Sequence, residues 1–390
     1  MIFRQITAVT LGFITGIIII ELFLWVILAT PLWHILPVVE PIIVRPNTES
    51  GTELIKGGVF IWPNENRVKV RINSYGLRDK ELKTSVDSTR VVLTGDSMVE
   101  ALQVDLNDTM DNKAEQSLLD LGFDVEIANL GAAGHGPLRQ LVRLENIGLN
   151  LEPNIVISVA TASDFVSGEL LNDADYPGYV RTPDGGLIRG DTFKNSFSRR
   201  FANRWQGQSF LSLLHFSNLF RAIYSIHAQP VTHFLGLSRT IENPTKDVCA
   251  TDYLRSLHTL WIERLPQDYW DSTAKFFDEY SQSVSSVGAI PVYALREIPF
   301  HPTRCHNEMA LRSELVTSVR QYLSDMDIRF IDWDRELLES HTFLLENTDD
   351  SSILYGFGTS LGNGHFNRLG HEASAEILSN IVISEMDAQP

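Results

Sequence analysis

A short apolar run that ends in a glycine turn constrains this 390-residue chain more than any other stretch. Residues 91–93, Val-Val-Leu, are too few for a helix and are rich in β-branched side chains, which is typical of a buried strand. The run ends at Gly95-Asp96-Ser97. In an open α/β sheet, ligands bind outside the carboxyl ends of the strands, so a serine there is exposed to substrate. Ser97 is therefore a candidate nucleophile, although Gly-Asp-Ser is also an ordinary turn.

The pattern of a short strand followed by a helix recurs along the chain. Further strands are predicted at 125–128, 155–160, 290–294 and 328–331, and helices at 110–121, 138–149, 272–286, 308–325 and 369–384. Three βα units in succession predict a parallel sheet with right-handed crossovers. We therefore expect an α/β fold: a doubly wound, flavodoxin-like parallel sheet of about five strands.

A glycine-rich loop follows the second predicted strand. Residues 129–136 read Asn-Leu-Gly-Ala-Ala-Gly-His-Gly. Glycines let backbone N–H groups approach a ligand without obstruction by a Cβ atom. The spacing is the reverse of the GxGxxG dinucleotide fingerprint and the loop lies on the wrong strand, so no nucleotide cofactor is expected.

The amino-terminal part of the chain predicts a membrane anchor. Residues 6–30 carry Glu21 as their only charged side chain, and a helix of 25 residues would span about 37 Å, enough for a hydrocarbon core of about 30 Å. A cleaved signal peptide is the alternative, but its apolar region is usually shorter, at about 7 to 15 residues. Arg4 and the free amine favour a cytoplasmic amino terminus and an extracytoplasmic main domain.

Glu21 lies close to the middle of this predicted span. An ionised carboxylate there costs about 2.5 to 3.5 kcal/mol, so we expect it to be protonated, paired or facing a membrane-protein partner. The alternative is that a very apolar helix simply tolerates one polar residue.

The chain is expected to divide into an anchor (1–34), a stalk with a lead-in strand (35–88) and a main domain (89–390) with an insertion at about 165–270. Four prolines within residues 35–66 suit either an extended stalk or a segment laid over the domain surface. The insertion is predicted to contain a small hairpin around 179–189 and an apolar helix at 210–224. Arg78, just before the nucleophile strand, could pair with a core carboxylate or be solvated, and solvation is the simpler expectation.

Composition excludes several partners and cofactors. A net charge of -17 argues against nucleic acid and anionic lipid surfaces. The two cysteines, Cys249 and Cys305, lack the spacing of a zinc site, and no metal is expected. In an extracytoplasmic domain they could form one disulfide, but the sequence does not show that they lie within reach of each other.

Four separate blocks stand in a fixed order along the chain: Gly95-Asp96-Ser97, Asn129 with Gly134, Ser163-Asp164, and Gly364-His365-Phe366-Asn367 with Gly370-His371. Together they resemble the SGNH (GDSL) hydrolase superfamily. Residues 72–78, Ile-Asn-Ser-Tyr-Gly-Leu-Arg, resemble the lead-in of its membrane-anchored bacterial members. The resemblance covers about 300 residues. It implies that Ser97 is the nucleophile and His365 its general base, with the N–H groups of Ser97 and Gly134 in an oxyanion hole.

Two positions depart from the family pattern. Ser163 stands where the family has an asparagine that donates to the oxyanion; a hydroxyl can still donate, although it is shorter. Asn363 and Gly362 stand where an aspartate usually precedes the histidine. In a serine triad, replacing the aspartate with asparagine lowers kcat by about four orders of magnitude. His365 is then oriented by Asn363, by a backbone carbonyl, or by a carboxylate from elsewhere such as Asp349 or Asp350.

Three functions follow from the resemblance. The first is an esterase or acyltransferase that forms an acyl-serine intermediate. The second is an O-acyltransferase partner, which accompanies a membrane-bound acyltransferase in modifying exported polysaccharide and faces it through Glu21. The third is a catalytically impaired scaffold that serves as an interaction subunit. In each enzymatic case the substrate is an extracytoplasmic ester, such as an acylated carbohydrate.

Overall fold

A five-stranded parallel sheet forms the centre of the molecule in the computed structural model, which describes residues 2–29, 44–47, 49–62, 65–83, 88–171, 176–195, 200, 204–220, 249–346 and 350–388. Its strands are β5 (Thr89–Gly95), β6 (Val125–Asn129), β7 (Ile155–Thr161), β10 (Ile290–Arg296) and β11 (Arg329–Asp332). They lie in the order β11-β10-β7-β5-β6, and every pairing is parallel. The predicted flavodoxin-like sheet is confirmed.

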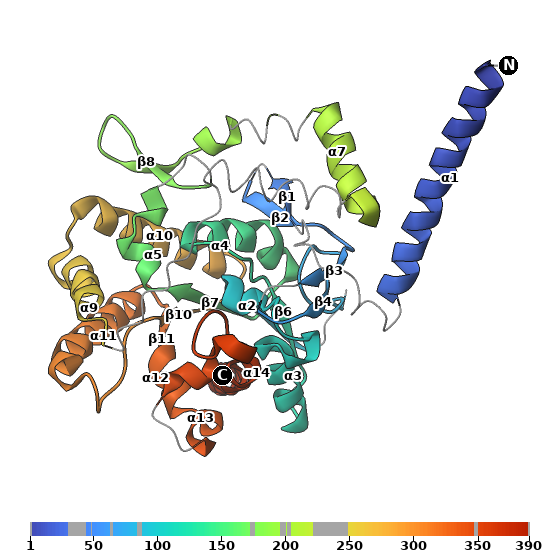
Figure 1. Ribbon diagram of the computed structural model, residues 1–390. Helices are drawn as coiled ribbons and strands as arrows, with labels where there is room; N and C mark the ends of the chain where they lie inside the picture. The colour runs from blue at the N-terminus through green and yellow to red at the C-terminus, as the bar shows by residue number, and fades with distance from the viewer. Residues whose placement is uncertain are drawn as a thin grey trace.

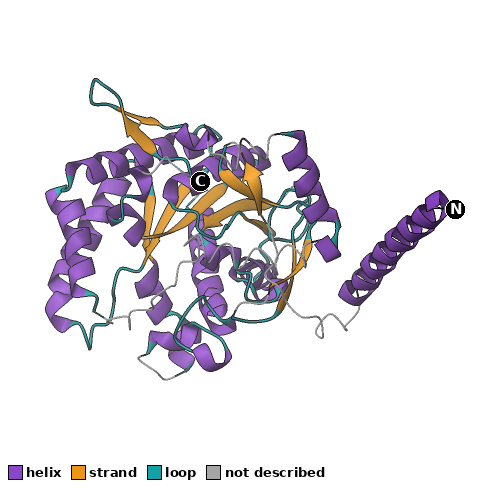
Figure 2. Cartoon of the chain, turned by 45° about the horizontal axis from the view of Figure 1, so that its top comes forward, coloured by secondary structure: helices purple, strands orange, loops and turns teal. Residues whose placement is uncertain are grey.

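Helices cover both faces of this sheet (Figures 1 and 2). One face carries α3 (Met110–Asp120), α12 (Trp333–Glu339) and α14 (Arg368–Asp387), and the other carries α4 (Pro137–Arg143), α10 (Gln267–Ser285) and α11 (Met309–Ser324). Successive side chains of a strand point to opposite faces, so Val91 and Leu93 enter one core and Val92 the other. From β5 the chain continues to β6 on one side and then to β7 on the other, so the topological switch point of the sheet lies between β5 and β7. Such sheets bind ligands at this point.

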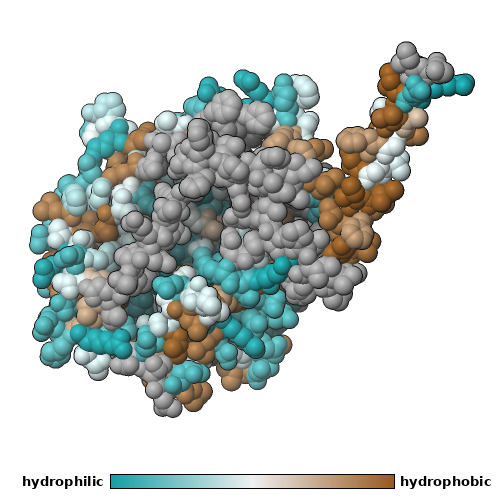
Figure 3. Space-filling model, viewed as in Figure 1, coloured by the Kyte–Doolittle hydropathy of each residue, from teal (hydrophilic) through white to brown (hydrophobic). Residues whose placement is uncertain are grey.

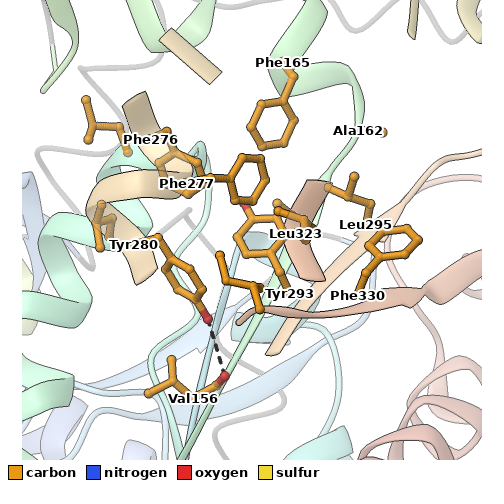
Figure 4. Close-up of a cluster of buried hydrophobic side chains, with 14 of the residues drawn as sticks. Val156, Ala162, Phe165, Phe276, Phe277, Tyr280, Tyr293, Leu295, Leu323 and Phe330 are labelled. Atoms are coloured by element: carbon orange, nitrogen blue, oxygen red, sulfur yellow. Dashed lines mark hydrogen bonds between the residues drawn. The ribbon is translucent and has the colours of Figure 1, made fainter. Parts of the chain in front are cut away.

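Aromatic side chains fasten the helix after β7 to the body of the domain (Figure 4). Phe165, in α5 (Ser163–Val166), stacks on Phe277 of α10 with ring centroids 5.5 Å apart. Phe277 packs edge-on against Tyr293 of β10 at 4.8 Å. Because Phe165 is buried in this cluster, the position of Ser163 at the start of α5 is fixed by packing.

The residues ahead of β5 form two antiparallel hairpins that lie on the domain. They are β1 (Val44–Asn47) with β2 (Gly51–Leu54), and β3 (Val59–Trp62) with β4 (Val68–Arg71). Leu54, Phe60 and Val70 form a small core with Leu102 of the main domain. From residue 44 onward the described chain is therefore laid over the surface, while residues 35–43 lie outside the described residues.

Arg78 is buried, so the expectation that it would be solvated is wrong. Its side chain is only 2% exposed, and Nη2 donates to the carbonyl oxygen of Val104 at 2.5 Å. The lead-in segment is thus built into the domain, since a buried guanidinium must find acceptors there.

The insertion contains the predicted hairpin and helix, with shifted bounds for the helix. β8 (Tyr179–Arg181) pairs with β9 (Leu187–Arg189). The helix α7 runs from Trp205 to Phe216, so it begins five residues earlier than predicted, and a new helical turn follows at 218–220. Residues 221–224 lie outside the described residues. Three further helices in the described residues are α2 (Ser97–Glu100), α9 (Thr251–His258) and α13 (His341–Leu345). Cys249 and Cys305 form a disulfide.

The amino-terminal helix α1 (Ile2–Ala29) stands beside the body (Figure 1). Its Arg4–Ile27 part is long and apolar enough to cross a membrane, and apolar residues cover it in Figure 3. The carboxylate of Glu21 accepts hydrogen bonds from Ser217, Asn218 and Leu219. Glu21 is therefore paired within its own chain.

Candidate active site

Ser97 stands where β5 ends and α2 begins, at the carboxyl edge of the sheet. The Asp96 carboxylate caps α2 by accepting from the Met98 N–H at 2.9 Å. As the first residue of the helix, Ser97 has no intrahelical acceptor for its own N–H. We call β5, α2 and the glycine loop 131–136 the nucleophile side of the site.

A buried arginine fixes Asp96. Arg296, at the end of β10, donates from Nη2 to Asp96 at 2.7 Å and to Thr161 at 3.0 Å. Burial raises the pKa of Asp96, but the Arg296 charge and the hydrogen bond from Met98 outweigh it, so the pKa lies below its usual value. Asp96 therefore stays ionised and holds the turn that presents Ser97.

A second acid on the nucleophile side holds the glycine loop. Glu100, at the end of α2, is 1% exposed and accepts from the Ala133 N–H at 2.8 Å. Burial raises its pKa to about 7. The next residue, Gly134, has φ +68°, and open space surrounds the position of a Cβ. Within the described part of the chain its N–H has no hydrogen-bond acceptor, while its carbonyl accepts from Arg139.

His365 is held by a carboxylate that the sequence analysis did not name. Nδ1 of His365 lies 2.5 Å from Oε1 of Glu65, and the His365 backbone N–H donates to Oε2 at 2.9 Å. Glu65 lies 300 residues earlier, between the two strands of the β3–β4 hairpin. We call Glu65 and the segment 355–367 the base side of the site. Since Nδ1 faces Glu65, Nε2 is the nitrogen left for a substrate or nucleophile.

The backbone on the base side is shaped around this pair. Glu65 has φ +64°, which is uncommon for a residue other than glycine and costs energy that its contacts must offset. A Cβ on Gly364, which has φ +90°, would meet Oε2 of Glu65 at 2.7 Å. Burial raises the pKa of Glu65, but its hydrogen bonds and charge interaction with His365 leave the pKa below the usual value. The carboxylate is ionised at neutral pH.

The two sides face each other. The N–H of Phe366 lies 3.3 Å from Sδ of Met98, so the residues that follow His365 and Ser97 are in contact. Phe366 is 1% exposed and stacks near Tyr355, with ring centroids 4.9 Å apart. Asn367 then caps α14 by accepting from the N–H groups of Leu369 and Gly370. Packing on Met98 and the α14 cap thus set the position of the histidine loop.

The residues expected to assist Ser97 and His365 have different surroundings. Asn363 is exposed, and its backbone N–H donates to the carbonyl of Ser360 at 3.1 Å, whereas Nδ1 of His365 faces Glu65. Asp350 accepts from the Ser352 N–H, and Asp349 lies outside the described residues. The Ser163 hydroxyl lies 3.4 Å from Glu297. Among the described residues, the carboxylate that faces Nδ1 of His365 is therefore that of Glu65.

Nothing in the motif spacing pointed to Glu65. It stands in an irregular stretch, Pro-Asn-Glu-Asn, with no periodicity to mark it. The available signal was indirect: the aspartate missing from the last block meant that another acid was needed. Arg296 was missed because a single arginine at the end of a strand carries no pattern.

A cavity of about 440 Å³ borders the base side. Its lining includes Asn66, Phe357, Leu361 and Arg368, which follow or flank the Glu65–His365 pair in sequence. Among the residues that the structure describes, no group of three or more histidines, cysteines or acids could hold a metal ion.

No family model and no curated protein matches the chain. Among solved structures, it is similar to a member of the lipolytic protein G-D-S-L family from Veillonella parvula (10% identity, 77% of this chain and 100% of the other, TM-score 0.34). It is also similar to the acetyl xylan esterase AlAXEase (12% identity, 75% of this chain and 99% of the other, TM-score 0.38). A third similar structure is a family 3 carbohydrate esterase from Clostridium thermocellum (10% identity, 78% of this chain and 100% of the other, TM-score 0.34). All three are distant likenesses.

Proposed function

We propose that this protein is a serine-dependent ester hydrolase or O-acyltransferase of the SGNH type. One observation carries the proposal: Glu65 holds His365 by its ring and by its backbone, on a loop that packs against the residue after Ser97. A carboxylate, an imidazole and a hydroxyl in this order are what nucleophilic acyl transfer requires. The missing aspartate before the histidine is replaced by Glu65.

In the proposed reaction, Ser97 Oγ attacks the acyl carbon of an ester and gives its proton to Nε2 of His365. The ionised Glu65 accepts from Nδ1–H and stabilises the imidazolium that forms. His365 then returns the proton to the alcohol oxygen as the ester bond breaks, which leaves an acyl-serine. Water, or the hydroxyl of an acceptor, attacks this intermediate and releases the acid or the new ester.

We assign the oxyanion hole to the N–H groups of Ser97 and Gly134. Ser97 supplies the first N–H of a helix, and Glu100 holds the glycine loop beside it through Ala133. Donors placed in advance cost no reorganisation when charge develops on the carbonyl oxygen. The Ser163 hydroxyl is a third candidate donor, and it must first turn away from Glu297.

We place the catalytic domain outside the cytoplasm, anchored by residues 6–30, with the division 1–34, 35–88 and 89–390. The apolar helix α1 and the Cys249–Cys305 disulfide support this location, because disulfides persist in oxidising compartments. The substrate class is an acylated carbohydrate or a related ester. A net charge of -17 makes anionic partners unfavourable.

The test is hydrolysis of a small chromogenic acetate ester by the full chain in detergent micelles. Ser97→Ala should lower kcat by at least about 10⁴-fold, because the nucleophile is lost while binding groups remain. Asn363→Ala, which alters an exposed residue on the same loop, is the matched control and should retain activity. If the wild type and Ser97→Ala show equal, background rates with this and with longer acyl esters, the protein is a scaffold and the proposal is wrong.

A further inference from the structure

One face of α1 is shielded although most of the helix is exposed. Within its described part, the partly or fully buried positions are Gly16, Glu21, Leu24 and Ile27. At 100° per residue these four positions fall within about 140° of the helix circumference, so they form a single stripe. That stripe marks the side on which the rest of the chain meets the helix.

Glu21 makes the contact at the centre of this stripe. Its Oε1 accepts from the Asn218 N–H at 2.7 Å and from Asn218 Nδ2 at 3.1 Å, and its Oε2 accepts from the Ser217 hydroxyl at 2.9 Å and the Leu219 N–H at 3.0 Å. Four donors converge on one carboxylate. Two of them are backbone N–H groups at the beginning of the helical turn 218–220, which have no intrahelical acceptor.

The depth of Glu21 determines where this contact lies. Glu21 is eight residues before Ala29, so it lies about 12 Å from the end of α1 along the helix axis. Half of a hydrocarbon core is about 15 Å. If α1 spans the membrane, as the proposed function assumes, residues 217–219 lie within the outer half of that core, because they touch Glu21 directly.

The segment around this contact mixes apolar and polar residues, and eight of residues 205–220 are leucine, phenylalanine or tryptophan. Residues 205–220 contain no aspartate, glutamate, lysine or arginine. Trp205 is 75% exposed and Leu213 is 50% exposed. Phe210 and Phe220 pack edge-on with centroids 5.7 Å apart and join α7 to the next helical turn. In Figure 1, α7 lies at the margin of the body, on the side that faces α1.

We propose that residues 205–220 form a second membrane element, which enters the outer leaflet beside α1 and is held there by Glu21. Helical hydrogen bonds pair backbone groups within α7, and the Glu21 carboxylate accepts from the N–H groups of Asn218 and Leu219; a segment in lipid needs such pairing. Its partner is the acyl chains of the bilayer. The catalytic domain is then fixed to the membrane at two points instead of hanging from one helix.

The test uses the full chain in phosphatidylethanolamine–phosphatidylglycerol liposomes. Cys249 and Cys305 are joined, so one added cysteine is the reactive thiol for a fluorescent label. Leu213→Cys reports on α7, Ile18→Cys in α1 is the lipid-facing control, and Val287→Cys, 43% exposed on the body, is the aqueous control. The label at residue 213 should be quenched several-fold more by nitroxide lipids than by iodide, as the label at residue 18 should be. The label at residue 287 should be quenched more by iodide.

Three results would overturn the proposal, and a fourth would disprove the anchor on which it rests. A label at 213 that behaves like the one at 287 places α7 in water, and a label shielded from both quenchers means that protein, not lipid, covers it. Glu21→Ala should shift the 213 label toward iodide, whereas Glu21→Gln, which keeps one acceptor oxygen, should shift it less. If Glu21→Ala changes nothing, Glu21 does not hold the segment. If alkaline carbonate washing removes the wild type and every variant from the liposomes, α1 is not a membrane anchor. Hydrolysis of a soluble ester that depends on Ser97 tests the active site separately.

Discussion

Two glutamates hold opposite sides of the candidate active site, and their environments differ. Glu100, on the nucleophile side, is 1% exposed and has a pKa raised by burial to about 7, while Glu65, on the base side, is partly exposed and has a pKa lowered by its bonds to His365. Glu100 belongs to the same strand-turn-helix unit as Ser97, whereas Glu65 comes from a hairpin 300 residues before the histidine. One side is a local structure, and the other is assembled from distant parts of the chain.

Among changes that distinguish the two sides, Glu65→Gln has the largest expected effect. The amide can still accept from Nδ1–H and keep the ring in place, but it offers no charge to the imidazolium, so kcat should fall about 10² to 10⁴-fold with KM nearly unchanged. Steady-state hydrolysis of a chromogenic ester measures this. Glu53→Gln, a change of the same chemistry in β2, is the control. A kcat within a few-fold of wild type would show that Glu65 does not serve the reaction.

The difference between the two sides explains what the sequence could predict. The strand at 91–93 and its glycine turn are readable because burial and turn chemistry act over a few residues, and the parallel sheet follows from repeating that unit. Glu65 could not be read in this way. Its role depends on the β3–β4 hairpin packing beside a loop near the carboxyl terminus, and tertiary contacts of this kind leave no local pattern. The family pattern showed only that an acid was missing.

Arg296→Leu should destabilise the nucleophile side. It removes the charge that offsets the Asp96 carboxylate, and breaking a buried ion pair costs about 3–5 kcal/mol because one charge stays buried alone. Urea unfolding in micelles measures the change in the free energy of unfolding. The double variant Arg296→Leu with Asp96→Asn should recover part of this loss. If the double variant loses as much free energy of unfolding as the two single variants together, the pair is not coupled as described.

Gly364→Ala should weaken the base side without touching the nucleophile side. The residue has φ +90°, and the added Cβ would meet Oε2 of Glu65 at 2.7 Å, so both the backbone and the carboxylate must move. We expect a loss of about 1–3 kcal/mol in stability. We also expect a 10- to 100-fold lower kcat, which corresponds to about 1.4–2.8 kcal/mol of transition-state stabilisation. Gly288→Ala, which has φ +74° at a turn with open space around it, is the control for backbone strain alone, and it should lower stability but not kcat.

The two glutamates should give opposite pH dependence to stability. The folded-state pKa of Glu100 is raised from 4.5 to about 7, so the folded state keeps a proton that the unfolded state releases, and stability falls as pH rises through this window. The lowered pKa of Glu65 gives stability above pH 4.5 that is lost at lower pH. Glu100→Gln keeps an acceptor for Ala133 and should be more stable than wild type by about 1–2 kcal/mol at pH 8, with little difference at pH 5. An equal difference at both pH values would mean that titration of Glu100 is not the cause.

The smallest expected effect comes from Asn363→Asp, which restores the family residue before the histidine. Without any other acid near His365, this change would supply the missing charge and raise kcat by about ten- to a thousandfold. Glu65 already accepts from Nδ1–H at 2.5 Å, and that nitrogen carries one proton, so an aspartate at 363 has no proton to accept. Its charge would lie at an exposed position, where screening weakens its effect on the imidazolium. We therefore expect kcat within about threefold of wild type, or somewhat below it if repulsion between two carboxylates loosens Glu65. The Glu65→Gln background reverses this expectation: there Asn363→Asp can supply the charge, and part of the lost kcat should return. A large gain from Asn363→Asp alone would show that Glu65 only holds the loop in place and that His365 lacks a catalytic acid in the wild type.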